Sequence, residues 1–290
     1  MFKIFFGQLL IATALSLCVL PGFSQTVKEP ADTNPDWSKP YQPFRIVGNI
    51  YYVGTYDLAC YLVVTNKGHM LINTGLASSG KQIKANVEQL GFSFKDIKIL
   101  LTTQAHFDHM GAMAEIKRLT GAQMMVDEKD ATVMADGGKS DYALGSEESS
   151  YAPVKADRLL KDGDLITLGD TQLKMLHHPG HTKGSCSFVV NVADRKILYK
   201  VLIANMPTIV TQHKFSEVKA YPEIAADYAY TLKQMKALKF HIWLSSHASQ
   251  FDLHGKHKEG QAYNPDAFRD QKGYDAALAD LSQALTEHEK

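Results

Sequence analysis

The chain has 290 residues, with 31 Lys and Arg against 31 Asp and Glu, and 45% of its residues are hydrophobic. This length allows one large domain with a sizeable core or two small ones, and the zero formal charge argues against a nucleic-acid-binding protein. The aromatic content of 10% excludes a disordered chain, and three cysteines are too few for a disulfide-rich scaffold.

The first 25 residues have the pattern of a secretory signal peptide. Lys3 is the positive n-region, residues 4–20 form an almost uncharged apolar run, and Gly22-Phe23-Ser24 is a small-x-small cleavage site. We therefore expect a signal peptide over 1–24, a mature domain over 25–290, and export to a bacterial periplasm without membrane attachment after cleavage. A membrane anchor and a lipoprotein are the alternatives, although the apolar run is short for a span.

The cysteines do not define a disulfide. Cys18 would leave with the signal peptide, Cys60 lies in an apolar strand pattern, and Cys186 follows a glycine-rich turn. In an oxidising compartment the last two could pair, but two buried free thiols agree equally well with the sequence.

Hydrophobic patterning along the mature chain predicts strands and helices in alternation after a Pro- and Asp-rich arm over 26–43. Strands are predicted over 51–53, 61–65, 70–74, 97–103, 123–126, 165–168, 172–177, 187–192, 197–203 and 241–245. Helices are predicted over 78–90, from after residue 109 to about residue 120, and from after the strand 123–126 to about residue 135. Two more helices are predicted over 222–238 and 267–285.

One long loop and the order of the predicted elements complete this part of the prediction. Residues 136–150 contain three Gly and four Ser, which predicts a mobile loop. The order is β-rich and then α, twice over, with no linker between the halves. One α/β domain of layered sheets covered by helices fits this order best.

A cluster of possible metal ligands, Gln104-x-His106-x-Asp108-His109, stands where a buried strand ends and a helix begins. Imidazole nitrogens and a carboxylate suit a divalent metal such as zinc. In an extended conformation residues 104 and 106 point the same way, while 108 and 109 can address a second point, so the motif can hold two ions. Scattered core histidines are the alternative, but burying such groups unpaired would be expensive.

Further ligands must come from distant parts of the chain. His181 lies in a turn between two predicted strands, and His247 follows the predicted strand 241–245. These two histidines are the best candidates.

The pattern resembles the metallo-β-lactamase superfamily, whose motif His-x-His-x-Asp-His is followed by a Gly-His-Thr turn and a late ligand histidine. Gln104, in place of the first histidine, resembles the GOB-type enzymes of subclass B3. The other stretches that carry the resemblance are Gly54-Thr55-Tyr56-Asp57, Leu71-Ile72-Asn73-Thr74-Gly75, His177-His178-Pro179-Gly180-His181-Thr182, Ile203-Ala204-Asn205-Met206-Pro207 and Ser246-His247-Ala248-Ser249-Gln250-Phe251-Asp252. The fold implied is a four-layer αβ/βα sandwich with the site at one edge, between the two sheets.

The resemblance implies two zinc sites. The first would be formed by Gln104, His106 and His181, and the second by Asp108, His109 and His247. Residues 204–207 offer no acid or thiol, which excludes a carboxylate bridge from that stretch, and Asn73 stands where the superfamily tends to have Asp. An amide oxygen is a weaker zinc ligand than imidazole, so one or two ions could work, with the second site favoured at low zinc.

The activity implied is hydrolysis of the β-lactam ring of penicillins, cephalosporins and carbapenems by metal-bound hydroxide, giving antibiotic resistance. Asp108 would also orient the nucleophile, and the protein is expected to be a monomer. Residues expected to contact substrate are Ser140, Asp141, Tyr142, Asn205, Met206 and Thr208. The alternatives are an exported zinc hydrolase of the same fold acting on a thioester, lactone or phosphodiester, and a non-catalytic zinc-binding protein.

Overall fold

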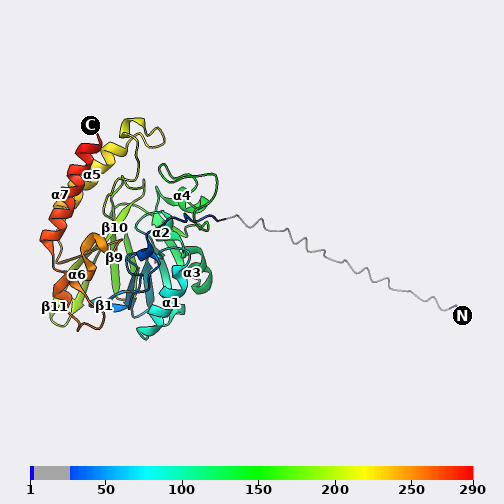
Figure 1. Cartoon of the computed structure of the whole chain (residues 1–290). Helices are drawn as coiled ribbons and strands as arrows, with labels where there is room; N and C mark the ends of the chain where they lie inside the picture. Colours follow the sequence, from blue (N-terminus) through cyan, green and yellow to red (C-terminus); the bar gives the residue numbers. More distant parts are fainter. Residues whose placement is uncertain (3–26, 290) are drawn as a thin grey trace.

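A computed structural model of the chain describes residues 1–2 and 27–289 (Figure 1). Apart from its first two residues, the predicted signal peptide lies outside the described residues. In the described part of the chain, no helix combines the length and the apolar character that crossing a membrane requires.

The first sheet has seven strands that follow one another in chain order. Strands β1 to β4 pair antiparallel, and β4 to β7 pair parallel. Parallel neighbours need crossover connections, which the helices α1 to α4 supply. The strands are β1 (Phe44–Val47), β2 (Ile50–Tyr52), β3 (Tyr61–Thr65), β4 (Gly68–Ile72), β5 (Ile97–Leu101), β6 (Gln123–Asp127) and β7 (Arg158–Leu160). The helices are α1 (Ser79–Gln89), α2 (Phe107–Met110), α3 (Met113–Thr120) and α4 (Ala131–Asp136).

The second sheet has five strands in the order β12-β11-β10-β9-β8. All neighbours are antiparallel except β11 and β12, which are parallel and connected through helix α5 (Ile224–Ala237). The strands are β8 (Leu165–Leu168), β9 (Thr171–His177), β10 (Cys186–Asp194), β11 (Ile197–Ala204) and β12 (Ile242–Ser245). Helix α7 (Gln271–His288) contacts α5, and short helical segments lie at Pro35–Trp37, Phe94–Asp96, Phe215–Glu217, Ser249–Phe251, α6 (Leu253–Lys256) and Pro265–Phe268.

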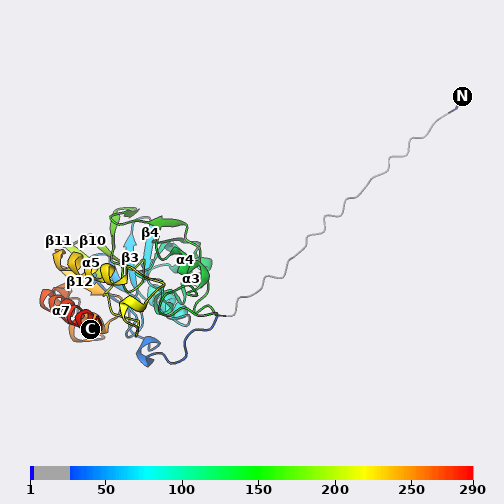
Figure 2. The same ribbon diagram turned by 90° about the horizontal axis from the view of Figure 1, so that it is seen from above.

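The two sheets form the middle of four layers (Figures 1 and 2). Side chains of the strands alternate between faces. Leu62 therefore belongs to the core shared with Ile83 of α1 and Ile116 of α3, whereas Val63 belongs to the core shared with Phe188 of the second sheet. That larger core continues to α5 and α7. The four-layer αβ/βα sandwich expected from the sequence is therefore confirmed.

The helix predicted up to about residue 120 is broken into α2 and α3 at Gly111. This residue donates its N–H to Gly75 O at 2.9 Å, and a Cβ here would lie 2.3 Å from the backbone of Leu76 and Ala77. Only glycine allows so close an approach between the start of α3 and the loop after β4.

The segment 136–150, predicted as a mobile loop, is held to the rest of the structure by several backbone and side-chain hydrogen bonds. Val27 of the N-terminal arm pairs with Ser149, and the Lys28 N–H donates to Ser149 O at 2.8 Å. Tyr142 Oη donates to Gly180 O at 3.0 Å. These contacts join residues far apart in the sequence, so local composition gives no sign of them.

The architecture brings several strand ends to one edge. Strands β4 and β5 of the first sheet and β9, β11 and β12 of the second end there, and the segments that follow them carry all of the predicted metal ligands. Cys60 and Cys186 are both buried free thiols.

Candidate metal centre

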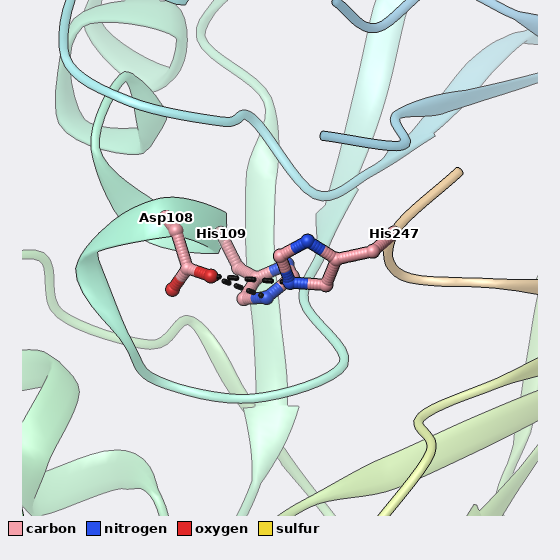
Figure 3. A group of neighbouring side chains, drawn as sticks. All are labelled: Asp108, His109 and His247. Atoms are coloured by element: carbon pink, nitrogen blue, oxygen red, sulfur yellow. Dashed lines mark ion pairs between the residues drawn. The ribbon is translucent and has the colours of Figure 1, made fainter. Parts of the chain in front are cut away.

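Three of the predicted ligands form a compact group. Asp108 and His109 lie in α2, and His247 follows β12; one ligand atom from each lies within 4.8 Å of the others. Asp108 Oδ2 is 3.2 Å from His109 Nε2 and 3.3 Å from His247 Nε2. The dashed lines in Figure 3 mark these two ion pairs. The structure thus gathers the predicted second set from two sheets.

The turn that presents these residues is fixed by side-chain hydrogen bonds. Asn73 Oδ1 accepts the Thr103 N–H at 2.9 Å, and Thr102 Oγ1 donates to Gln104 O at 2.6 Å. His106 has extended backbone and accepts the Met110 N–H at 2.9 Å, which starts α2. Because His106 precedes the helix and Asp108 lies within it, their side chains are directed to different points.

The other predicted ligands, Gln104, His106 and His181, line a pocket that Asp108 and His247 also line. The rings of His106 and His181 lie 4.9 Å apart between centroids. Gln104 Oε1 is buried and has no hydrogen-bond partner among the described residues. This set combines two imidazoles with one amide oxygen.

Three of the four imidazoles have an oxygen beside the nitrogen that faces away from their group. His181 Nδ1 lies 2.7 Å from Thr208 O, and His247 Nδ1 lies 3.2 Å from Asp57 Oδ2. His106 Nε2 lies 3.2 Å from Asp141 Oδ2, although the two are not aligned for a hydrogen bond. Such outer oxygens fix the tautomer and orientation of metal-binding histidines.

Charge is strongly coupled within the group. Burial alone would raise the pKa of Asp108, but His109 and His247 outweigh it and hold that pKa well below its usual range. Burial alone would lower the pKa of His247, but the carboxylates of Asp108 and Asp57 raise it to about 9. Burial, aided by His106, lowers the pKa of His181 to about 3, which keeps it neutral. The ionised carboxylate and the neutral His181 imidazole are the forms that bind metals.

Unpaired polar atoms show that a metal fits here. Gln104 Oε1 and both ring nitrogens of His109 are buried without a hydrogen-bond partner among the described residues. Burying such atoms unpaired is costly. A divalent cation in the first set would satisfy Gln104 Oε1, and one in the second set would satisfy a His109 nitrogen. The donors of the two sets, which are imidazoles, a carboxylate and an amide oxygen, suit zinc.

The pocket above these residues has a volume of about 200 Å³. Its lining includes Asn205, Met206 and Thr208 from the predicted substrate contacts. Ser140, Asp141 and Tyr142 are not in the lining; Leu144 is, from the same segment. A larger open groove of about 540 Å³ between α5 and α7 lies in the outer helical layer, and the described residues form no cluster of metal-binding side chains there.

Known proteins share this architecture. The model of the metallo-beta-lactamase superfamily matches residues 54–199. A class B3 di-zinc metallo-beta-lactamase, LRA-12 from an Alaskan soil metagenome, is 63% identical, with a TM-score of 0.90 and coverage of 91% of this chain and 100% of that chain. The chain belongs to the metallo-β-lactamase superfamily.

Within this superfamily the chain is similar to class B3 enzymes, as its motifs predict. The metallo-beta-lactamase GOB-18 from Elizabethkingia meningoseptica is 55% identical over 91% of this chain and 98% of that chain, with a TM-score of 0.90. Among curated proteins, the acyl-coenzyme A thioesterase MBLAC2 of Bos taurus is 28% identical over 138 residues, which are 42% of this chain and 47% of that protein. The chain spans about half the length of the curated relatives it matches.

Two residues that support the site of this metallo-β-lactamase fold were not predicted. Trp37 Nε1 donates to Asp57 Oδ2 at 3.0 Å, and its ring packs 5.5 Å from that of His247. Asp57 also accepts the Ser249 N–H at 2.8 Å. These hydrogen bonds from Trp37 and Ser249 fix the Asp57 carboxylate, which in turn orients the ring of His247. The stretch ending in Asp57 stands out in the sequence, but nothing local shows that it meets a residue 190 positions later.

Asp130 was also not predicted. Its buried carboxylate accepts the Ala105 N–H at 2.9 Å, the Thr182 hydroxyl at 2.7 Å and the Gly184 N–H at 2.7 Å. These bonds join the turn that bears Gln104 and His106 to the turn that bears His181. An aspartate before a helix usually reads as a cap, so the sequence gives no signal for this role.

Proposed function

We propose that this protein is an exported zinc hydrolase that opens the β-lactam ring of penicillins, cephalosporins and carbapenems and so confers antibiotic resistance. One observation carries the proposal: Asp108, His109 and His247 present ligand atoms within 4.8 Å of one another, beside a pocket that also holds Gln104 and His181. The likeness to class B3 di-zinc metallo-beta-lactamases across the described domain supports it.

We assign the metal to these residues. Gln104, His106 and His181 would hold one zinc ion, and Asp108, His109 and His247 the other, the second set being favoured at low zinc because it contains a carboxylate. Zinc, when bound, would lower the pKa of water so that hydroxide is available at neutral pH, and it would polarise a carbonyl oxygen. One or two ions agree with this donor set.

Asp108 is the catalytic carboxylate in this proposal. Its Oδ2 is directed to His109 and His247 (Figure 3), which leaves Oδ1 to accept a hydrogen bond from the attacking water. The low pKa of Asp108 keeps that oxygen ionised at neutral pH, so it orients the water through an accepted hydrogen bond.

The pocket lining would bind the substrate. Asn205 Nδ2 is a buried donor without a partner among the described residues, and it could donate to a substrate oxygen. Trp37, Leu144 and Met206 give the pocket apolar walls. Thr208 also lines the pocket. Ser140, Asp141 and Tyr142 precede Leu144 in the same segment, and contact of these three residues with substrate is part of the proposal.

Export to a bacterial periplasm completes the proposal, because β-lactams act on the cell envelope and an exported enzyme meets them first. The signal-peptide pattern over 1–24 supports it. We expect a monomer that is free of the membrane after cleavage and binds no nucleic acid.

A hydrolysis assay on the purified mature protein tests the function. Zinc-loaded protein should open the ring of a carbapenem, EDTA should suppress the activity, and clavulanate should not, because no acyl-enzyme serine is involved. Rapid cleavage of S-lactoylglutathione with negligible β-lactam turnover would instead assign the protein to the thioester hydrolases. Zinc binding without either activity would support a metal-binding role alone.

A further inference from the structure

Asp141 belongs to the segment 136–150 and contacts the turn that bears Gln104 and His106. Its side chain is 4% exposed. Oδ1 accepts the Ala143 N–H at 2.9 Å and the Leu144 N–H at 2.8 Å, while Oδ2 lies 3.2 Å from His106 Nε2. The turn uses only Oδ1, so the second oxygen is available to His106.

The next residue contacts the backbone that carries the other histidine of the first ligand set. Tyr142 Oη lies 3.0 Å from Gly180 O and 3.2 Å from His181 O, either of which can accept its proton, and its ring packs 5.0 Å from that of Tyr221. Two consecutive residues of one segment therefore fix both histidines of the first set. This arrangement explains why the segment is packed down although its composition is that of a loop.

We propose that Asp141 is a positioning residue of the first zinc site: it holds the proton of neutral His106 on Nε2 and so leaves the Nδ1 lone pair for the metal. The inference rests on the proposed zinc function. A neutral imidazole carries one proton, and the nitrogen nearer a carboxylate keeps it. The attraction acts at 3.2 Å even without ideal hydrogen-bond alignment.

The presence of Gln104 in the first ligand set makes the role of Asp141 more important. In the first set an amide oxygen contributes no charge, so zinc binding depends on the two imidazoles. A carboxylate beside a metal-binding histidine raises the basicity of that ligand. Asp57 plays the matching part for His247, at 3.2 Å from its Nδ1. Each zinc site thus has one carboxylate–histidine pair, and the pair with Asp141 supports the weaker site.

The variant Asp141→Asn separates this role from a structural one. Asn keeps the oxygen that accepts the two backbone N–H groups, and these donors prevent the amide from turning over. Its NH₂ group then faces His106 Nε2, which favours the proton on Nδ1 and removes the metal-binding lone pair. Zinc affinity of the first site should fall about 10–100-fold, with the second site unchanged.

The experiment is zinc titration of metal-free mature protein by equilibrium dialysis, for wild type, Asp141→Asn and the control Glu147→Gln. Glu147 is an exposed acid of the same segment, so its change removes an equal charge without touching His106. Selective loss of the weaker zinc in Asp141→Asn alone supports the proposal. Two-zinc binding by Asp141→Asn with wild-type affinities would overturn it.

A second measurement does not depend on a variant. Nitrogen-15 NMR of zinc-loaded wild-type protein should place the His106 proton on Nε2, whereas a proton on Nδ1 would overturn the proposal. Wild-type protein that binds no zinc would end both this inference and the proposed function. Wild-type protein that binds two zinc ions and hydrolyses β-lactams, with Asp141→Asn unchanged, would end this inference only.

Discussion

At the scale of single residues, the proposed metal site depends on oxygens that lie outside the two ligand sets. Asp57, Asp141 and the carbonyl of Thr208 each stand beside the outer nitrogen of one imidazole. These contacts decide which nitrogen of each ring is left for a metal. The chemistry of the ligands is visible in the sequence, but their tautomers are set by residues from other elements.

The two ligand sets should respond differently to substitution. Asp108→Ala removes the carboxylate between His109 and His247 and should reduce β-lactam hydrolysis to background. Gln104→Ala removes the neutral, weak ligand of the proposed first site and should lower zinc affinity there by about 10–100-fold, an effect comparable to losing an outer partner. The check is kcat/KM for both variants at limiting and at saturating zinc.

Saturating zinc should rescue Gln104→Ala and not Asp108→Ala. His109→Ala and His247→Ala, which also remove second-site ligands, serve as the matched comparison. If Gln104→Ala and Asp108→Ala lose the same activity at every zinc concentration, the second site does not act alone.

The sequence predicts six candidate ligands; five of them line one pocket, and the sixth, His109, lies beside Asp108 and His247. The sequence does not predict Trp37, Asp57 or Asp130. Four of the candidate ligands have a distinctive spacing because they share one short turn. Their supports are ordinary polar or aromatic side chains from distant parts of the chain: Asp57 lies 190 residues from His247, and Asp130 lies 25 residues from Ala105. Contacts over such separations follow from tertiary packing and leave no local pattern.

At the scale of elements, most strands follow from their hydrophobic patterning, and the exceptions have physical causes. Strand β1 (Phe44–Val47) and strand β7 (Arg158–Leu160) are short edge strands of the first sheet, and their four- and three-residue patterns are too brief to recognise. The break between α2 and α3 comes from the approach of Gly111 to Leu76, which only the folded chain shows.

An ion pair outside the metal ligands joins the two sheets and should make stability depend on pH. Asp127 ends β6, His177 ends β9, and Asp127 Oδ2 lies 2.7 Å from His177 Nδ1. Burial alone would lower the pKa of His177, but Asp127 raises it above its usual value, with further attraction from Asp227 and Asp162.

Because the folded pKa exceeds the unfolded one, the charged pair stabilises fully below pH of about 6.5, and this contribution is lost as pH rises through the folded pKa. Urea unfolding of wild type and His177→Gln at one zinc concentration measures it. Their difference should shrink with rising pH, from about 1.5–3 kcal/mol for a charged hydrogen bond to about 0.5–1.5 kcal/mol for a neutral one. A difference that grows between pH 6 and pH 9 would contradict the assignment.

At the scale of the whole molecule, both ligand sets draw on both sheets. Gln104, His106, Asp108 and His109 follow β5 of the first sheet, whereas His181 follows β9 and His247 follows β12 of the second. A metal bound to either set would therefore hold the two halves of the sandwich together. The N-terminal arm adds to this, because Trp37 and Val27 reach the second ligand set and the segment 136–150.

The same arm connects the folded domain to the predicted signal peptide, and this gives the last prediction. Mature protein from a bacterial periplasm should begin near Gln25, because Gly22-Phe23-Ser24 is the small-x-small site after the apolar run.

Expression of the full chain in a susceptible bacterium should raise its tolerance to a carbapenem. Deletion of residues 2–24 should abolish that protection while the purified protein keeps its activity, because an enzyme retained in the cytosol does not meet the antibiotic before its target does. N-terminal sequencing and growth at graded antibiotic concentrations are the measurements. Equal protection by the deleted form, or Met1 at the start of active periplasmic protein, would show that residues 1–24 are not a cleaved export signal.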